Sequence, residues 1–180
     1  MKTTIVNKNA SILRKTALPV LIKDIHTKKI QNILARMKTA LNKEDDGVAI
    51  AAPQIGESLR IFMISGRVPT ILNNPLEGEP RKREKFPDAV YINPEIKKLS
   101  KKKVQVEEGC LSVRWLYGLV ERSEKAIIRA YDENGKKFEK GASGLVAQIF
   151  QHEVDHLNGI LFTDKAKNIE NLPPTKKKTK

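Results

Sequence analysis

The stretch SGLVAQIFQHEVDHLN, residues 143–158, combines the pattern of a buried helix with a possible metal-binding motif. Its apolar residues recur at helical spacing and predict a buried helix, with Ser143 as a candidate N-cap and Gly159 just past the end. Within it, QHEVDH contains the pattern H-E-x-x-H. Because residues four apart lie on one helix face, His152 and His156 can hold one metal ion, and Glu153 can reach a water bound to it. The stretch therefore predicts a metal site on a rigid helix.

Two histidines leave such a site incomplete, since catalytic zinc or iron sites typically take three protein ligands and a water. Metzincins supply a third histidine, but Phe162 stands at that position here. Cys110 is the single cysteine, so no internal disulfide can form, and its thiolate is a strong ligand for divalent transition metals. A distal carboxylate is the alternative third ligand, and apolar filler is the alternative role of Cys110.

The remaining patterns predict one helix, several strands and then the motif helix. Residues 24–42 have a helical apolar stripe, with Asp24 or Thr27 as cap. We predict a small-residue loop over 47–56, a strand over 58–65, a long surface loop over 66–90, a strand that ends at Pro94, a strand over 101–113 that runs into a functional turn, and three further strands over 118–140 with a hairpin turn at Asn134-Gly135.

This order predicts an α+β fold, in which mostly antiparallel sheets pack around the central C-terminal helix that carries the motif. A length of 180 residues fits one domain with a tail. We expect a catalytic domain over residues 1–165 and a basic, disordered tail over 166–180.

The net charge and the composition indicate which partners and which cellular location to expect. The formal net charge is +13, from 34 Lys and Arg against 21 Asp and Glu, which favours weak, nonspecific attraction to ribosomal RNA. Aromatic residues make up only 5% and no nucleic-acid motif is present, so no specific DNA partner is expected. Neither a secretory signal nor an apolar run long enough for a membrane helix is found, so we expect a cytoplasmic protein, or one in an organellar stroma or matrix, with no membrane partner.

Three segments together resemble a known family. GVAIAAPQ (47–54), EGCLS (108–112) and QHEVDHL (151–157) are similar, in this order, to the three motifs of peptide deformylases. The resemblance covers roughly residues 12–164 and implies the deformylase activity, in which the formyl group of an N-terminal formyl-methionine is hydrolysed and formate is released. It implies nascent formyl-methionyl peptides as partners and a divalent ion as cofactor, with Fe(II) expected in the cell and Zn(II), Ni(II) or Co(II) as substitutes.

The resemblance also implies roles for single residues. Cys110, His152 and His156 would hold the metal, Glu153 would move protons, and the Gln54 amide and the Leu111 N–H would stabilise the oxyanion. Glu108 would pair with Arg122, and Gln151 would orient the metal ligands. The residues expected at the substrate are Val48, Ala49, Gly109, Leu145 and Ile149. The chain departs from the family pattern at Ala49, at Arg114–Tyr117 and at Gln148.

Two other functions fit parts of the pattern. One is a metallopeptidase with the same helix motif and a different third ligand. The other is a non-enzymatic basic binding protein with a structural metal. A structural site would close all four positions with protein ligands, whereas Cys110, His152 and His156 provide three, which favours an open, catalytic position.

Overall fold

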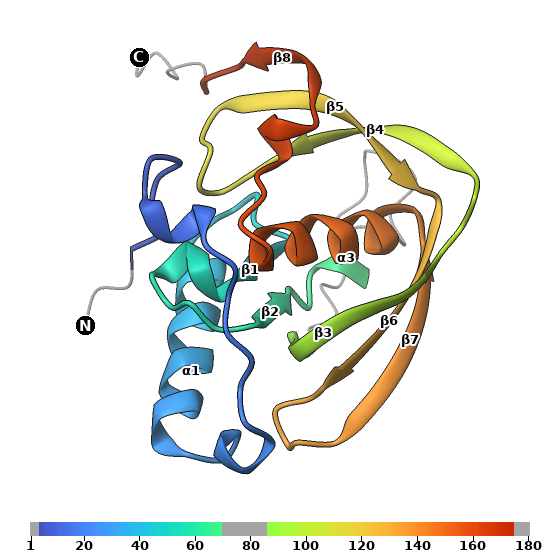
Figure 1. Cartoon of the computed structure of the whole chain (residues 1–180). Helices are drawn as coiled ribbons and strands as arrows, with labels where there is room; N and C mark the ends of the chain where they lie inside the picture. Colours follow the sequence, from blue (N-terminus) through green and yellow to red (C-terminus); the bar gives the residue numbers. More distant parts are fainter. Residues whose placement is uncertain (1–3, 70–85, 175–180) are drawn as a thin grey trace.

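Helix α3 (Gly144–Leu157) lies between two antiparallel sheets in the computed structural model, which describes residues 4–69 and 86–174 (Figure 1). The larger sheet has the order β1 (Ala49–Ala51), β2 (Ile61–Ile64), β3 (Ala89–Leu99), β6 (Lys125–Tyr131), β7 (Lys137–Ser143). The smaller sheet has the order β4 (Lys103–Gly109), β5 (Leu116–Ser123), β8 (Lys167–Asn171). The predicted α+β fold around the C-terminal helix is confirmed.

The larger sheet is covered by a helix on each face. Successive side chains of a strand point to opposite faces, and β2 divides its residues accordingly. Ile61 and Met63 belong to the core cluster of helix α1 (Lys28–Asn42), whereas Phe62 and Ile64 belong to the cluster of α3. All four residues are buried, which explains why β2 is a continuous apolar run.

Helix α1 forms as its periodicity predicts. Thr27 is the N-cap, and its side chain accepts a hydrogen bond from Ile30 N. The apolar stripe is buried against the sheet: Ile30, Ile33, Leu34, Met37, Ala40 and Leu41. The residues before it form two short 3-10 helices, Ser11–Arg14 and Ile22–Asp24.

Helix α3 ends in a glycine motif that fixes the chain after the last histidine. Gly159 has a φ of 76°, its N–H bonds to His156 O, and Ile160 N bonds to Asp155 O. The end of the helix is therefore as predicted. At its start, Ser143 occupies the N-cap position, but its side chain makes no capping hydrogen bond.

Two predicted boundaries near the larger sheet are wrong. Strand β3 does not end at Pro94 but continues to Leu99, with register shifts on either side of Glu95 and Ile96. Asn93 adopts a φ of 50° and holds Val20 through both its amide atoms, so Pro94 lies at an irregularity where no ladder hydrogen bond is required of it. The segment 47–56 is not all loop, because it contains β1 and the 3-10 helix Ala52–Ile55.

The C-terminal prediction is also wrong in part. Residues 167–171 form β8, which pairs with β5 through Leu116↔Asn171 and Tyr117↔Glu170, so they belong to the smaller sheet and not to a disordered tail. Residues 175–180 of the predicted tail, and residues 70–85 of the predicted loop, lie outside the described residues. The three strands and the hairpin turn predicted over 118–140 are confirmed as β5, β6 and β7. No helix within 4–69 and 86–174 has the length and apolarity to cross a membrane.

Gly159 and Gly56 give a matched test of the turn after α3. Both have positive φ, but a Cβ at Gly159 would lie 2.8 Å from the Arg14 carbonyl carbon and oxygen, whereas a Cβ at Gly56 would meet nothing within 4 Å. We expect Gly56→Ala to lower the free energy of unfolding by about 1–2 kcal/mol through backbone strain alone. Gly159→Ala should lower it by about 2–4 kcal/mol because overpacking adds to that strain. Urea unfolding measures both, and equal losses would contradict the close packing of Arg14 on this turn.

Candidate metal and active site

One cysteine and two histidines converge at the end of β4 and on the facing side of α3. Cys110 directly follows β4, and His152 and His156 lie one turn apart on α3. The Cys110 Sγ lies 3.2 Å from His156 Nε2, and one ligand atom from each of the three residues lies within 4.8 Å of the others. This is the spacing expected of atoms that share an ion at metal–ligand distances of about 2.0–2.3 Å.

The charges in this cluster favour the ligand form of the cysteine. Burial opposes ionisation of the Cys110 thiol, but the neighbouring His156 and His152 imidazoles outweigh it and lower the pKa of the thiol to about 5. A thiolate and two imidazoles are a donor set suited to divalent transition metals. The residues present therefore fit a metal ion at this point.

A buried acid orients His152. The Glu108 Oε2 lies 2.9 Å from His152 Nδ1, and the same carboxylate accepts two hydrogen bonds from Arg122, at 2.7 and 2.9 Å. Burial raises the pKa of Glu108, but Arg122 and His152 more than offset it and lower this pKa to about 2. The carboxylate can hold the Nδ1–H of His152, which leaves the Nε2 lone pair for a metal. The expected pairing of Glu108 with Arg122 is confirmed.

Glu153 is a buried acid beside the two histidines. Its side chain is buried, and its Oε2 has no hydrogen-bond partner among the described residues. Burial raises the pKa of this carboxyl group to about 7, against the opposing effect of the two neighbouring imidazoles. A carboxyl group whose pKa lies near neutrality can both accept and donate a proton under ordinary conditions.

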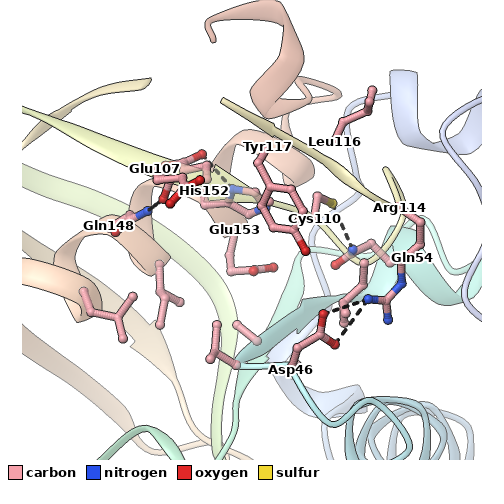
Figure 2. A pocket seen from close by; sticks show the side chains of 18 of the residues that line it. Asp46, Gln54, Glu107, Cys110, Arg114, Leu116, Tyr117, Gln148, His152 and Glu153 are labelled. Carbon is pink, nitrogen blue, oxygen red and sulfur yellow. Dashed lines mark hydrogen bonds and ion pairs between the residues drawn. The ribbon is translucent and has the colours of Figure 1, made fainter. Parts of the chain in front are cut away.

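Gln54 faces the cysteine from the opposite wall. Its Oε1 accepts a hydrogen bond from Ala51 N at 2.8 Å, which fixes the orientation of the amide. Its Nε2 then points to Cys110 Sγ at 3.5 Å (Figure 2). The same Nε2 donates to Ser112 Oγ at 3.2 Å. Gln54 therefore presents a donor group beside the Cys110 thiol, from the short 3-10 helix that follows β1.

These residues open into a cavity of about 260 Å³. All the residues expected to contact substrate line it: Val48, Ala49, Gly109, Leu145 and Ile149. Leu111 also lines it, next to Cys110. Gln148 adds a polar group to this wall, and its side chain crosses from α3 to donate to Glu107 O at 2.8 Å (Figure 2).

An ion pair between Arg114 and Asp46 forms part of the cavity lining. Arg114, which follows the cysteine turn, binds both oxygens of Asp46 at 3.2 and 2.9 Å (Figure 2). It also pairs with Glu44. Its guanidinium lies 5.2 Å from the ring centroid of Trp115, a residue with a φ of 64°. In the sequence, the segment Arg114–Tyr117 was noted as a difference from the family pattern. No sequence signal identified Asp46 or Glu44 as partners of Arg114.

Two residues of the motif helix differ from expectation. Gln151 does not orient the ligands, because its amide bonds to Ser123 N, Ser123 O and Ala147 O and so ties α3 to the end of β5. The sequence pattern did not single out Asp155, which accepts a hydrogen bond of 2.6 Å from Arg122 Nη1. A buried carboxylate requires a cation nearby, so the position of Asp155 on a helix predicted to be buried was a signal that it has a cationic partner.

The chain matches the family model described as "Polypeptide deformylase" over residues 2–172. Among curated relatives, it is 38% identical over 162 residues to peptide deformylase 1A, chloroplastic/mitochondrial, of Arabidopsis thaliana, with 89% of this chain and 60% of the relative covered. It is 38% identical over 165 residues to the peptide deformylase of Symbiobacterium thermophilum, with 92% and 67% covered. The chain thus spans about 60% of the length of the plant relative.

Solved structures of peptide deformylases are also similar to this chain. A class I type b peptide deformylase from Acinetobacter baumannii, bound to Met-Ala-Ser, matches with a TM-score of 0.76 and 31% identity, with 92% of this chain and 98% of that chain covered. A peptide deformylase from Legionella pneumophila matches with a TM-score of 0.75 and 35% identity over 93% and 88%. The motifs in the sequence, the cysteine–histidine cluster and these similarities lead to one conclusion: the chain belongs to the polypeptide deformylase family.

Proposed function

We propose that this protein is a metal-dependent hydrolase that removes the N-formyl group from the N-terminal formyl-methionine of newly made polypeptides and releases formate. One observation carries the proposal: Cys110 Sγ and ring nitrogens of His152 and His156 lie within 4.8 Å of one another beside Glu153, which is buried with one oxygen unpaired among the described residues. The family membership and the Met-Ala-Ser bound to the similar Acinetobacter baumannii enzyme support the substrate class.

In this proposal Cys110, His152 and His156 hold one divalent ion. The ion would supply Lewis acidity, which lowers the pKa of a water molecule and polarises the formyl carbonyl. Glu153 takes a proton from the attacking water on its unpaired Oε2 and delivers it to the nitrogen of the departing methionine. Its burial keeps bulk water from competing for this proton.

Gln54 and Leu111 serve the oxyanion that develops on the formyl oxygen. The Gln54 Nε2 is already aimed at the reaction centre by the hydrogen bond that Ala51 N makes to the other amide atom. Donors that are positioned before the reaction stabilise the transition state without a cost of reorganisation. The Leu111 N–H, next to the ligand cysteine, is proposed as the second donor.

The cavity wall is proposed to hold the methionine side chain and the peptide backbone. Val48, Leu145 and Ile149 give part of this wall an apolar lining, which suits the methionine side chain. Ala49 lies on β1, which is an edge strand in the part of the chain that the structure describes and pairs there with β2, so its main chain is proposed to bind an extended peptide. Gly109 lies across the cavity, where a Cβ would come within 2.7 Å of the Tyr117 ring.

We propose Fe(II) as the ion in the cell, with Zn(II), Ni(II) or Co(II) able to replace it, because one thiolate and two imidazoles bind all four. We propose a cytoplasmic location, or an organellar one, since one similar plant protein is named chloroplastic/mitochondrial. A net charge of +13 supports weak association with ribosomes through the basic surface and the C-terminal KKKTK.

Glu153→Ala tests the proton transfer. Formate release from a formyl-Met-Ala-Ser peptide should fall by about 10³-fold or more, since a positioned acid–base group contributes about 10²–10⁴-fold. Bound metal, measured by elemental analysis after anaerobic purification, should stay at the wild-type level. Glu121→Gln, at an exposed position of β5, is the control and should leave the rate unchanged. Equal rates for Glu153→Ala and wild type would remove Glu153 from the mechanism.

Cys110→Ser tests the third ligand. A serine hydroxyl stays protonated at neutral pH, so the variant should lose metal to a chelator at least about tenfold more readily and lose turnover with it. Ser112→Ala, in the same turn but outside the proposed ligand set, should keep its metal. A Cys110→Ser protein that retains both metal and hydrolysis would point to another third ligand and to the metallopeptidase alternative.

Ribosome association is tested by removing the basic C-terminus without touching β8. A chain that ends at residue 174 should cosediment with ribosomes less than the full chain at low salt, and both should dissociate as salt is raised because phosphate contacts are screened. Deformylase activity on a short peptide should be the same for both chains. Cosedimentation that does not change on truncation would rule out the terminal lysines as the contact.

A further inference from the structure

A continuous series of ion pairs runs from the proposed metal site to the protein surface. It starts at His152, passes through Glu108 and Arg122 to Asp155, and ends at Lys165. Lys165 Nζ lies 2.7 Å from both oxygens of Asp155. The inner members are almost fully buried, whereas the Lys165 side chain is 41% exposed. Lys165 is thus the most exposed member of this series and its solvent-facing end.

With His152 neutral, as a metal ligand must be, the series is balanced in charge only when Lys165 is included. Glu108 and Asp155 are the two carboxylates, and Arg122 and Lys165 are the two cations that contact them. Arg122 uses its Nε and one terminal nitrogen for Glu108, and gives only the other terminal nitrogen to Asp155. Because Lys165 satisfies both oxygens of Asp155, Arg122 can keep its two-point contact with Glu108.

Loss of the lysine charge would change this division. Asp155 would then be a nearly buried carboxylate whose one remaining cation, within residues 4–69 and 86–174, is Arg122, and uncompensated buried charge is strongly unfavourable. The guanidinium would be drawn toward Asp155 and away from Glu108, which holds His152 Nδ1. Partners of this kind, beyond the ligands themselves, set ligand orientation and metal affinity.

We propose that Lys165 is a positioning residue of the metal site, which acts through Asp155, Arg122 and Glu108 on the orientation of His152. This rests on the proposed metal site and deepens it. Lys165 follows the 3-10 helix Phe162–Asp164 and precedes β8, so it also links the C-terminal segment above α3 to the site (Figure 1). The preceding residue is anchored too, since Asp164 pairs with Arg14.

The test uses the full chain loaded with Zn(II), and follows release of zinc to a chromogenic chelator. Lys165→Met and Lys165→Gln remove the charge, whereas Lys165→Arg retains it. Lys102→Met is the matched control, because Lys102 makes an ion pair of the same 2.7 Å length with Glu124 on the surface. We expect zinc release about five- to tenfold faster in both neutral variants than in wild type, and within twofold of wild type in the Arg variant and the control.

Turnover gives an independent readout. On formyl-Met-Ala-Ser, the neutral variants should lose kcat by a similar factor while KM stays within twofold, since the cavity wall is unchanged. Zinc release from Lys165→Met at the rate of the Lys102→Met control would overturn the proposal, as would a lower Tm without faster release, which marks a merely structural lysine. If Lys165→Met does not fold, Lys165→Gln decides by the same criteria. A wild type that releases no formate would refute the proposed function, while zinc release would still decide the role of Lys165.

Discussion

The buried guanidinium of Arg122 is the interaction on which the site depends. It comes from β5, and it binds Glu108 at the end of β4 and Asp155 on α3. One side chain thus joins the smaller sheet to the central helix at the level of the proposed ligands. Because a planar guanidinium offers fixed donor directions, it sets both the distance and the angle between the two elements. The turn that carries Cys110 is thereby held over the two histidines.

The rest of the fold makes that contact rigid. Helix α3 is packed through Phe150 and Val154 onto the larger sheet, where Phe62 and Tyr91 stack with ring centroids 4.5 Å apart. The glycine turn at its end stops the helix directly after the last histidine. The reactive side chains therefore project from elements whose own positions are fixed by packing, as precise metal and proton-transfer geometry requires.

The sequence predicted the parts of the site that depend on local spacing. His152, Glu153 and His156 follow from helix periodicity, and Cys110 was singled out because it is the one cysteine. The passage of β3 through Pro94 could not be predicted, because it depends on Asn93 binding Val20, far away in the chain. Strand β8 was missed because all its side chains are exposed and show no alternation. The Lys165 contact likewise depends on tertiary structure alone.

X-ray absorption spectroscopy of the zinc-loaded protein tests the proposed metal site most directly, because it counts the atoms around the ion. We expect one sulfur at about 2.3 Å, two imidazole nitrogens at about 2.0–2.1 Å and one further light atom from solvent. Cys110→Ser should lose the sulfur contribution. A wild-type spectrum without sulfur, or one with four protein ligands and no solvent position, would contradict the central claim that Cys110, His152 and His156 form an open, catalytic metal site.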